Sequence, residues 1–226
     1  MEFDLEFALE TVGPLLMAFL QVTLVVTVAG SVVAALLGLL WAVCQRELPT
    51  PVRLPLSWVL DVIRMTPLPL QLLFAVAIFI SFDGYRKFPD TDVETIGMIL
   101  GVAVFAIHYS TYMAESYRAG IDSIRQGQWE AATALSLPRS RVWRAVIIPQ
   151  ALRATLPSLG NWAIAMFKDT PFLLVILVPE MVAKAKQLGG ASYQYTEVFT
   201  VAGLIFLAAS YPTAVLMRKL EKKLVY

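Results

Sequence analysis

The sequence predicts an all-α integral membrane protein with five transmembrane helices. Of the 226 residues, 58% are hydrophobic and only 15% are charged, whereas soluble proteins carry roughly 25% charged residues. Five apolar stretches are long enough to cross a bilayer, which takes about 20 residues each. We therefore expect a single transmembrane domain over residues 1–226 rather than a water-soluble fold.

The expected spans are separated by polar connections and cover residues 14–43, 56–80, 96–115, 155–178 and 198–217. The first span carries a stripe of threonines and small residues from Thr23 to Gly38, which favours close packing against another helix. The second span is interrupted by Pro67 and Pro69. Prolines free backbone carbonyls, and within a membrane such carbonyls are tolerated where they line a cavity.

The distribution of Lys and Arg predicts the orientation of the spans. Twelve basic residues lie after the first span, between the third and fourth spans, and in the C-terminal tail, against four on the other face. Because cytoplasmic connections are enriched in Lys and Arg, we expect the N-terminus outside and the C-terminus in the cytoplasm. The connection from about residue 118 to 153 is then a cytoplasmic loop.

Several residue types that build catalytic or metal sites are scarce. Cys44 is the only cysteine and His108 the only histidine, which excludes an intrachain disulfide and a multi-histidine metal site. The sequence has no Gly-Lys pair and so no G-x-x-x-x-G-K-[ST] phosphate loop. If the protein uses ATP, another chain binds it. The first ten residues lack the basic region of a cleaved signal peptide, so they are expected to stay attached.

The cytoplasmic loop predicts two short helices. The segment "QWEAATALS" is rich in helix formers. Pro138 ends it and suits the first turn of a second helix, "RSRVWRAVII", which is expected to continue to Pro149. Ala131, Ala132 and Leu135 are expected to form one small apolar face. The first helix could lie on the lipid headgroups with arginines toward anionic lipid, or it could receive another protein surface.

Four segments of the chain resemble one transporter family. "EAATALSLPRSRVWRAVIIPQ" resembles the cytoplasmic EAA loop of ABC-importer permeases. The segments "RMTPLPLQLLF", "AESYRAGIDSIRQGQWEAA" and "NWAIAMFKDTPF" resemble further motifs of the polar amino acid permeases, a family of histidine, glutamate, glutamine, arginine, opine and ectoine types. The order matches, and the resemblance covers most of the chain. Ser136 stands where the loop pattern has glycine, and Pro69 and Pro171 are further departures.

The resemblance implies a type I ABC importer permease fold in the bacterial cytoplasmic (inner) membrane. It implies the transmembrane subunit of an ATP-driven importer, which translocates a polar amino acid or similar small zwitterion delivered by a solute-binding protein. In this family the EAA loop docks in a groove of the ATP-binding subunit. The matched positions here are Glu130, Ala131, Ala132 and Ser136.

The resemblance also implies the partners. They are a dimer of ATP-binding cassette subunits, a second permease subunit that is identical or related, a periplasmic or lipid-anchored solute-binding protein, and the lipid bilayer. No nucleic acid is expected. ATP and Mg²⁺ would bind the partner subunits, so we expect no catalytic residue, metal or cofactor on this chain and do not expect it to be an enzyme.

Polar residues inside the second span are candidates for contact with substrate, because intramembrane charges are costly. Arg64 suits a substrate carboxylate through bidentate hydrogen bonds. It could instead extend to the headgroups or pair with Asp61. Gln71, one helical turn beyond Pro67, could add an amide contact.

The fourth span carries Lys168 and Asp169 near the expected midplane. Adjacent helical residues do not face each other, so each needs its own partner. Asp169 suits a substrate ammonium and Lys168 a helix end or an acid from another span, and the alternative is a structural ion pair. For Glu115 we expect a salt bridge with Arg118 instead of substrate contact.

Two other function classes compete with the importer subunit. An ATP-independent membrane channel or scaffold would differ only in lacking a loop that recruits an ATPase. A membrane-embedded enzyme would need convergent catalytic groups, and His108 and Cys44 are far apart in the sequence. The sequence does not distinguish histidine, arginine, glutamate, glutamine or ectoine as the substrate.

Overall fold

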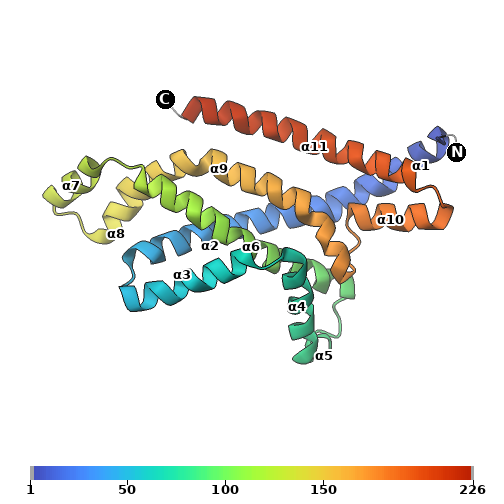
Figure 1. Ribbon diagram of the computed structural model, residues 1–226, viewed down its shortest axis with the longest axis horizontal. Coiled ribbons are helices and arrows are strands. Elements are labelled where there is room, and N and C mark those ends of the chain that lie inside the picture. Colours follow the sequence, from blue (N-terminus) through green and yellow to red (C-terminus); the bar gives the residue numbers. More distant parts are fainter. Residues whose placement is uncertain (1–2, 225–226) are drawn as a thin grey trace.

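The computed structural model describes residues 3–224, and every regular element of these residues is a helix (Figure 1). In chain order the elements are α1 (Leu5–Ala18), η1 (Phe19–Thr23), α2 (Leu24–Glu47), α3 (Thr50–Met65), α4 (Leu68–Ser81), α5 (Gly84–Lys87), α6 (Val93–Asp122), α7 (Gln126–Ala134), α8 (Arg139–Arg141), η2 (Val142–Ile147), α9 (Ile148–Asp169), η3 (Thr170–Ile176), α10 (Met181–Ser192) and α11 (Tyr195–Leu224). The elements η1 and η2 are π-helical turns, and η3 is a 3₁₀-helix.

Three helices are long and apolar enough to cross a membrane, namely Leu5–Glu47, Val93–Asp122 and Tyr195–Leu220. Two bent pairs pass the same test when each is taken together. In one pair α3 meets α4 at 107°, and in the other Arg139–Ile176 meets α10 at 54°. If each bent pair is one span, the described residues contain the five expected spans. Most of these helices extend beyond the expected bounds.

The bend between α3 and α4 lies at Thr66 and Pro67, where the sequence predicts an interruption. Pro67 has no N–H, so the carbonyl of Ile63, four residues earlier, loses its helical donor. The side-chain nitrogen of Gln71 replaces that donor, at 2.7 Å from the Ile63 oxygen and 3.0 Å from the Thr66 oxygen. The interruption is confirmed, and the bend turns α4 across the direction of the other long helices (Figure 1).

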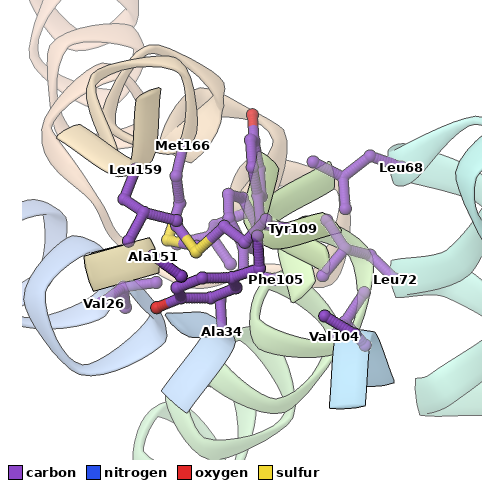
Figure 2. Packing of buried hydrophobic residues seen from close by; sticks show 14 of the residues in the cluster. Val26, Ala34, Leu68, Leu72, Val104, Phe105, Tyr109, Ala151, Leu159 and Met166 are labelled. Carbon is purple, nitrogen blue, oxygen red and sulfur yellow. The ribbon is translucent and has the colours of Figure 1, made fainter. Parts of the chain in front are cut away.

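The core forms where α2 packs along α6, with α4 and α9 on either side. Figure 2 shows side chains of all four helices meeting there, among them Val26, Ala34, Leu72, Phe105 and Met166. Gly38 permits the close approach of α2 and α6. A Cβ at Gly38 would lie 2.9 Å from the Cβ of Met113 and 3.0 Å from the carbonyl oxygen of Ser110. The packing stripe predicted for the first span is confirmed.

The elements α8, η2 and α9 form one continuous helical run from Arg139 to Asp169. The prediction that the second loop helix ends at Pro149 is therefore wrong. A proline ring normally clashes with the carbonyl four residues earlier. Here the wider π-helical turn of η2 directly precedes α9 and changes the bonding at that point. The loop helix is thus rigidly joined to the fourth expected span.

The helix α10 does not end at its glycines. It continues past Gly189 to Ser192 and ends at Tyr193, whose φ is 59°. Gly189 is instead a packing residue, since a Cβ there would lie 2.7 Å from the Cδ1 atom of Tyr195 and 3.2 Å from its Cα. This close approach holds α10 against α11.

The two ends of the molecule carry different elements. Figure 1 shows α7, α8 and the turn between α2 and α3 at one end, with the end of α11 on the same side. The start of α1 and the helix α10 lie at the other end. The expected orientation requires the loop and the C-terminus to share a side, and this arrangement agrees with it. Which side faces the cytoplasm stays a prediction.

Candidate functional site

The helix α7 carries the EAA segment and packs on η2. Ala132 is buried, with 3% of its surface exposed. Trp129 packs edge-on against Trp143 of η2, with ring centroids 5.6 Å apart. Glu130 and Ala131 lie on the exposed side. The exposed side of α7 therefore presents a carboxylate beside a small residue, and the opposite side packs on η2.

The prediction that Ala131, Ala132 and Leu135 form one face is wrong. Ala132 turns inward, whereas Leu135 is 72% exposed. Consecutive helical residues point about 100° apart, so packing onto η2 divides the small residues between two faces.

Ser136 ends α7 in the left-handed region, with φ of 49°. The N–H of Leu137 donates to the Ala132 carbonyl at 3.1 Å, and the N–H of Ser136 donates to the Thr133 carbonyl at 2.9 Å. This pair of bonds is a Schellman motif, which usually places glycine at the left-handed position. The backbone is therefore strained at Ser136. This serine adopts the conformation that the glycine of the loop pattern would adopt.

A hollow of about 820 Å³ opens beside α7. Glu130 and Ser136 line it, together with Glu47 from the end of α2 and Arg139 from α8. Two of the four expected coupling residues thus share one concave surface, Ala131 is exposed beside them, and Ala132 supports them from inside.

Residues at the end of α2 anchor this loop to the transmembrane helices. Glu47 accepts a hydrogen bond from the Nε1 atom of Trp143 at 3.1 Å and pairs with Arg139 at 3.3 Å. The guanidinium of Arg46 pairs with Asp122 of α6 and lies 5.0 Å from the ring centroid of Trp129. The sequence offers no periodic signal for these contacts, because they join residues up to 96 positions apart.

Arg64 lies at the end of α3 in a chain of charges. It pairs with Asp61, and its Nη1 atom lies 3.5 Å from Glu115, which pairs with Arg118 at 2.9 Å. The expected Glu115–Arg118 salt bridge is confirmed, and the alternative partner expected for Arg64, Asp61, is present. Contact between Arg64 and substrate stays a prediction.

A second large hollow, of about 970 Å³, lies between α6 and α9 and reaches Arg64. Tyr112, Trp162 and Arg153 also line it. Of the four expected substrate-path residues, Arg64 alone lines this hollow. Gln71 uses its amide nitrogen on backbone carbonyls at the α3–α4 bend, so that nitrogen is already occupied.

Asp169, at the end of α9, and the backbone of Arg64 both bond to α6, through tyrosines that lie one helical turn apart. Asp169 accepts a hydrogen bond from the hydroxyl of Tyr109 at 2.6 Å, while the hydroxyl of Tyr112 donates to the Arg64 carbonyl at 3.2 Å. The Tyr109 and Tyr112 ring centroids are 6.1 Å apart. Lys168 is exposed and makes no ion pair with the described side chains of residues 3–220, 222 and 223. The expected partner for Lys168 is therefore not found there.

Residues 34–226 match the family described as the binding-protein-dependent transport system inner membrane component. The chain belongs to this family. Among its relatives is a probable amino-acid ABC transporter permease protein of Sinorhizobium fredii, 33% identical over 98% of this chain and 91% of that protein. The arginine transport system permease protein ArtQ of Bacillus subtilis is 28% identical, over 93% of each chain. This permease is therefore a component of an amino acid ABC transporter.

Solved structures agree with the fold of the permease. A crystal structure of an amino acid ABC transporter with histidines matches with a TM-score of 0.80 and 29% identity, over 99% of this chain and 100% of that one. The MetNI methionine ABC transporter, in an inward-facing conformation, matches with a TM-score of 0.72 at 16% identity, over 93% of this chain and 98% of that one. The permease therefore has the type I ABC importer fold.

Proposed function

We propose that this permease is the translocating subunit of an ATP-driven importer for a polar amino acid or similar small zwitterion. A solute-binding protein delivers the substrate on the outer face of the bacterial inner membrane. ATP hydrolysis takes place on a dimer of separate ATP-binding subunits, and a second permease subunit, identical or related, completes the pathway. The N-terminus lies outside and the C-terminus lies in the cytoplasm.

The observation that carries the coupling role is the exposed Glu130 beside the hollow under α7. A partner that receives α7 in a groove would contact the exposed Glu130, Ala131 and Ser136. Because Ala132 and Trp129 pack on η2, and η2 continues into α9, a push on α7 reaches a transmembrane helix directly. Reversing a two-state population from 1:99 to 99:1 takes about 5.5 kcal/mol, which a loosely held helix could not transmit.

The substrate class is supported by opposite charges near one stretch of α6. Arg64 lines a large hollow, where its guanidinium also pairs with Asp61 and Glu115, and Asp169 is linked to the same stretch of α6 through Tyr109. Tyr112 and Trp162, with ring centroids 4.7 Å apart, add an aromatic wall at that hollow. A zwitterion with a carboxylate and an ammonium group fits such an arrangement, since each pole meets an opposite charge.

The experiment that tests the coupling role is a pull-down with the ATP-binding subunit encoded for the same transporter. The permease should retain that subunit in detergent, and Glu130→Lys should abolish retention. Glu10→Lys is the matched control, because Glu10 is exposed and belongs to α1, which begins at the opposite end of the molecule from α7. Equal retention by both variants would contradict the role of α7, and no retention by the wild type would favour a channel or scaffold.

A further inference from the structure

A third hollow, of about 300 Å³, lies where the ends of α2 and α6 meet the start of α3. Arg46, Arg53 and Arg118 line it, and Asp122 is the acidic residue in its described lining. Three guanidinium groups therefore face one carboxylate. The transport proposal uses neither the hollow nor Arg53.

The ion pairs of these arginines leave positive charge available. Arg46 pairs with Asp122, and Arg118 pairs with Glu115 at 2.9 Å. Arg53 is half-buried and makes no ion pair among the side chains that the structure describes, in residues 3–220, 222 and 223. A half-buried guanidinium without an acidic partner favours an anion brought from outside the chain.

Gln45 adds a second, independent observation. Only 9% of this residue is exposed, and its Nε2 atom donates to the Ser57 hydroxyl at 3.0 Å. Its Oε1 atom is buried without a hydrogen-bond partner among the described residues, although Gln45 lines the hollow. Buried side-chain acceptors are nearly always paired, so this oxygen calls for a donor in the hollow.

We propose that this hollow binds a phosphate group that carries a neighbouring hydroxyl. Guanidinium groups bind phosphate oxygens by charge-assisted, often bidentate hydrogen bonds, and the hydroxyl donates to the Oε1 atom of Gln45. Two sources share this chemistry. One is the headgroup of phosphatidylglycerol in the leaflet beside the loop, and the other is a free hydrogen phosphate ion.

The hollow shares Arg46 with the contacts that hold the cytoplasmic loop against α2. The Arg46 guanidinium that lines it also lies over Trp129 of α7. An anion bound there therefore contacts the same group that holds α7 against α2. The proposal concerns binding alone and stands whether or not α7 docks an ATP-binding subunit.

The test is isothermal titration of the purified full chain in an uncharged detergent. One arm adds dihexanoyl-phosphatidylglycerol, the second adds inorganic phosphate, and dihexanoyl-phosphatidylcholine serves as the reference lipid. Saturable binding in the first arm alone assigns the site to the lipid, and saturable binding of phosphate assigns it to the soluble ion. The dissociation constant should rise at least about tenfold in Arg53→Gln, because one charge-assisted contact is lost.

Arg141→Gln is the matched control. Arg141 is an exposed arginine of α8, and it does not line the hollow. This variant should leave the titration unchanged. Gln45→Glu should weaken binding because it places a negative charge where the phosphate lies. If Arg53→Gln aggregates, Arg53→Lys replaces it and should bind with intermediate affinity. No saturable binding in either arm, or equal binding by the Arg53 and Arg141 variants, overturns the proposal.

Discussion

Ser136 occupies a backbone position that glycine fills at lower cost. Its φ of 49° is left-handed, and the left-handed conformation costs a residue with a Cβ about 1–2 kcal/mol. The Schellman bonds of Leu137 and Ser136 hold it there. The strained residue lies close to Glu130, since both line the hollow beside α7.

Ser136→Gly should therefore stabilise the end of α7. Relief of about 1 kcal/mol corresponds to roughly fivefold slower exchange of the Leu137 amide, which is bonded to Ala132. Hydrogen exchange followed by mass spectrometry measures this. The control Ser140→Gly lies in the helical segment α8, where glycine lowers stability. Faster exchange in Ser136→Gly than in the wild type would show that the serine is not strained.

Arg64 and Asp169 are predicted to act on one substrate. Arg64→Ala and Asp169→Asn should each lower uptake at least about tenfold, because each removes a charge-assisted contact. Basal ATP hydrolysis by the assembled complex should survive. Tyr109→Phe is the matched control, since it removes the hydrogen bond to Asp169 and keeps both charges. If Tyr109→Phe reproduces the Asp169 defect, Asp169 acts through structure; normal uptake in Arg64→Ala would exclude the substrate contact.

At the scale of the elements, the sequence predicts which segments become helices better than how they join. The apolar runs and the composition of α7 follow from local chemistry, and so does the break at Pro67. The 107° bend does not, because it depends on Gln71 reaching back to Ile63 and on α4 packing against α6. Likewise, the burial of Ala132 depends on the position of η2, which α9 follows without a break, past Pro149.

The candidate site shows the same division. The EAA positions and Arg64 are visible as motifs in the chain, since each stands in a recognisable local pattern. Glu47 and Arg46 are not, because their partners Trp143 and Asp122 are brought close only by the packing of α2 with the loop and α6.

Close packing of α2 on α6 predicts opposite outcomes for the same substitution at two glycines. Gly38→Ala should lower thermal stability, because the new Cβ meets a backbone oxygen 3.0 Å away. Gly203→Ala in α11 should be neutral or stabilising by up to about 1 kcal/mol, since nothing lies within 4 Å of its Cβ position. Unfolding midpoints in detergent measure both. A Gly38 variant at least as stable as the Gly203 variant would contradict the packing.

At the scale of the whole molecule, the orientation predicts which positions are reached from each side of the membrane. In a Cys44→Ser background, a cysteine at Arg141 should react with an impermeant reagent only from the cytoplasm, and one at Asp90 only from outside. Both positions are exposed, and the basis is the asymmetry of basic residues. Labelling of both from one side would contradict the five-span arrangement.

The whole molecule links one end to the other through continuous helices. The loop helix α7 packs on η2, and α9 follows η2 without a break. The last residue of α9 is Asp169, which is bonded to Tyr109 of α6. A movement of α7 can thus reach the region of Arg64 and Asp169 without crossing a flexible joint. We therefore propose that α7 transmits the action of a partner to the transmembrane path.

The most direct test is substrate uptake and ATP hydrolysis by the complete transporter reconstituted in vesicles with its loaded binding protein. Glu130→Lys should insert in the membrane as well as Glu10→Lys does, because Glu130 is exposed. It should nevertheless lose uptake and the stimulation of ATP hydrolysis by the binding protein, whereas Glu10→Lys keeps both. Wild-type uptake and stimulated hydrolysis in Glu130→Lys would contradict coupling through α7.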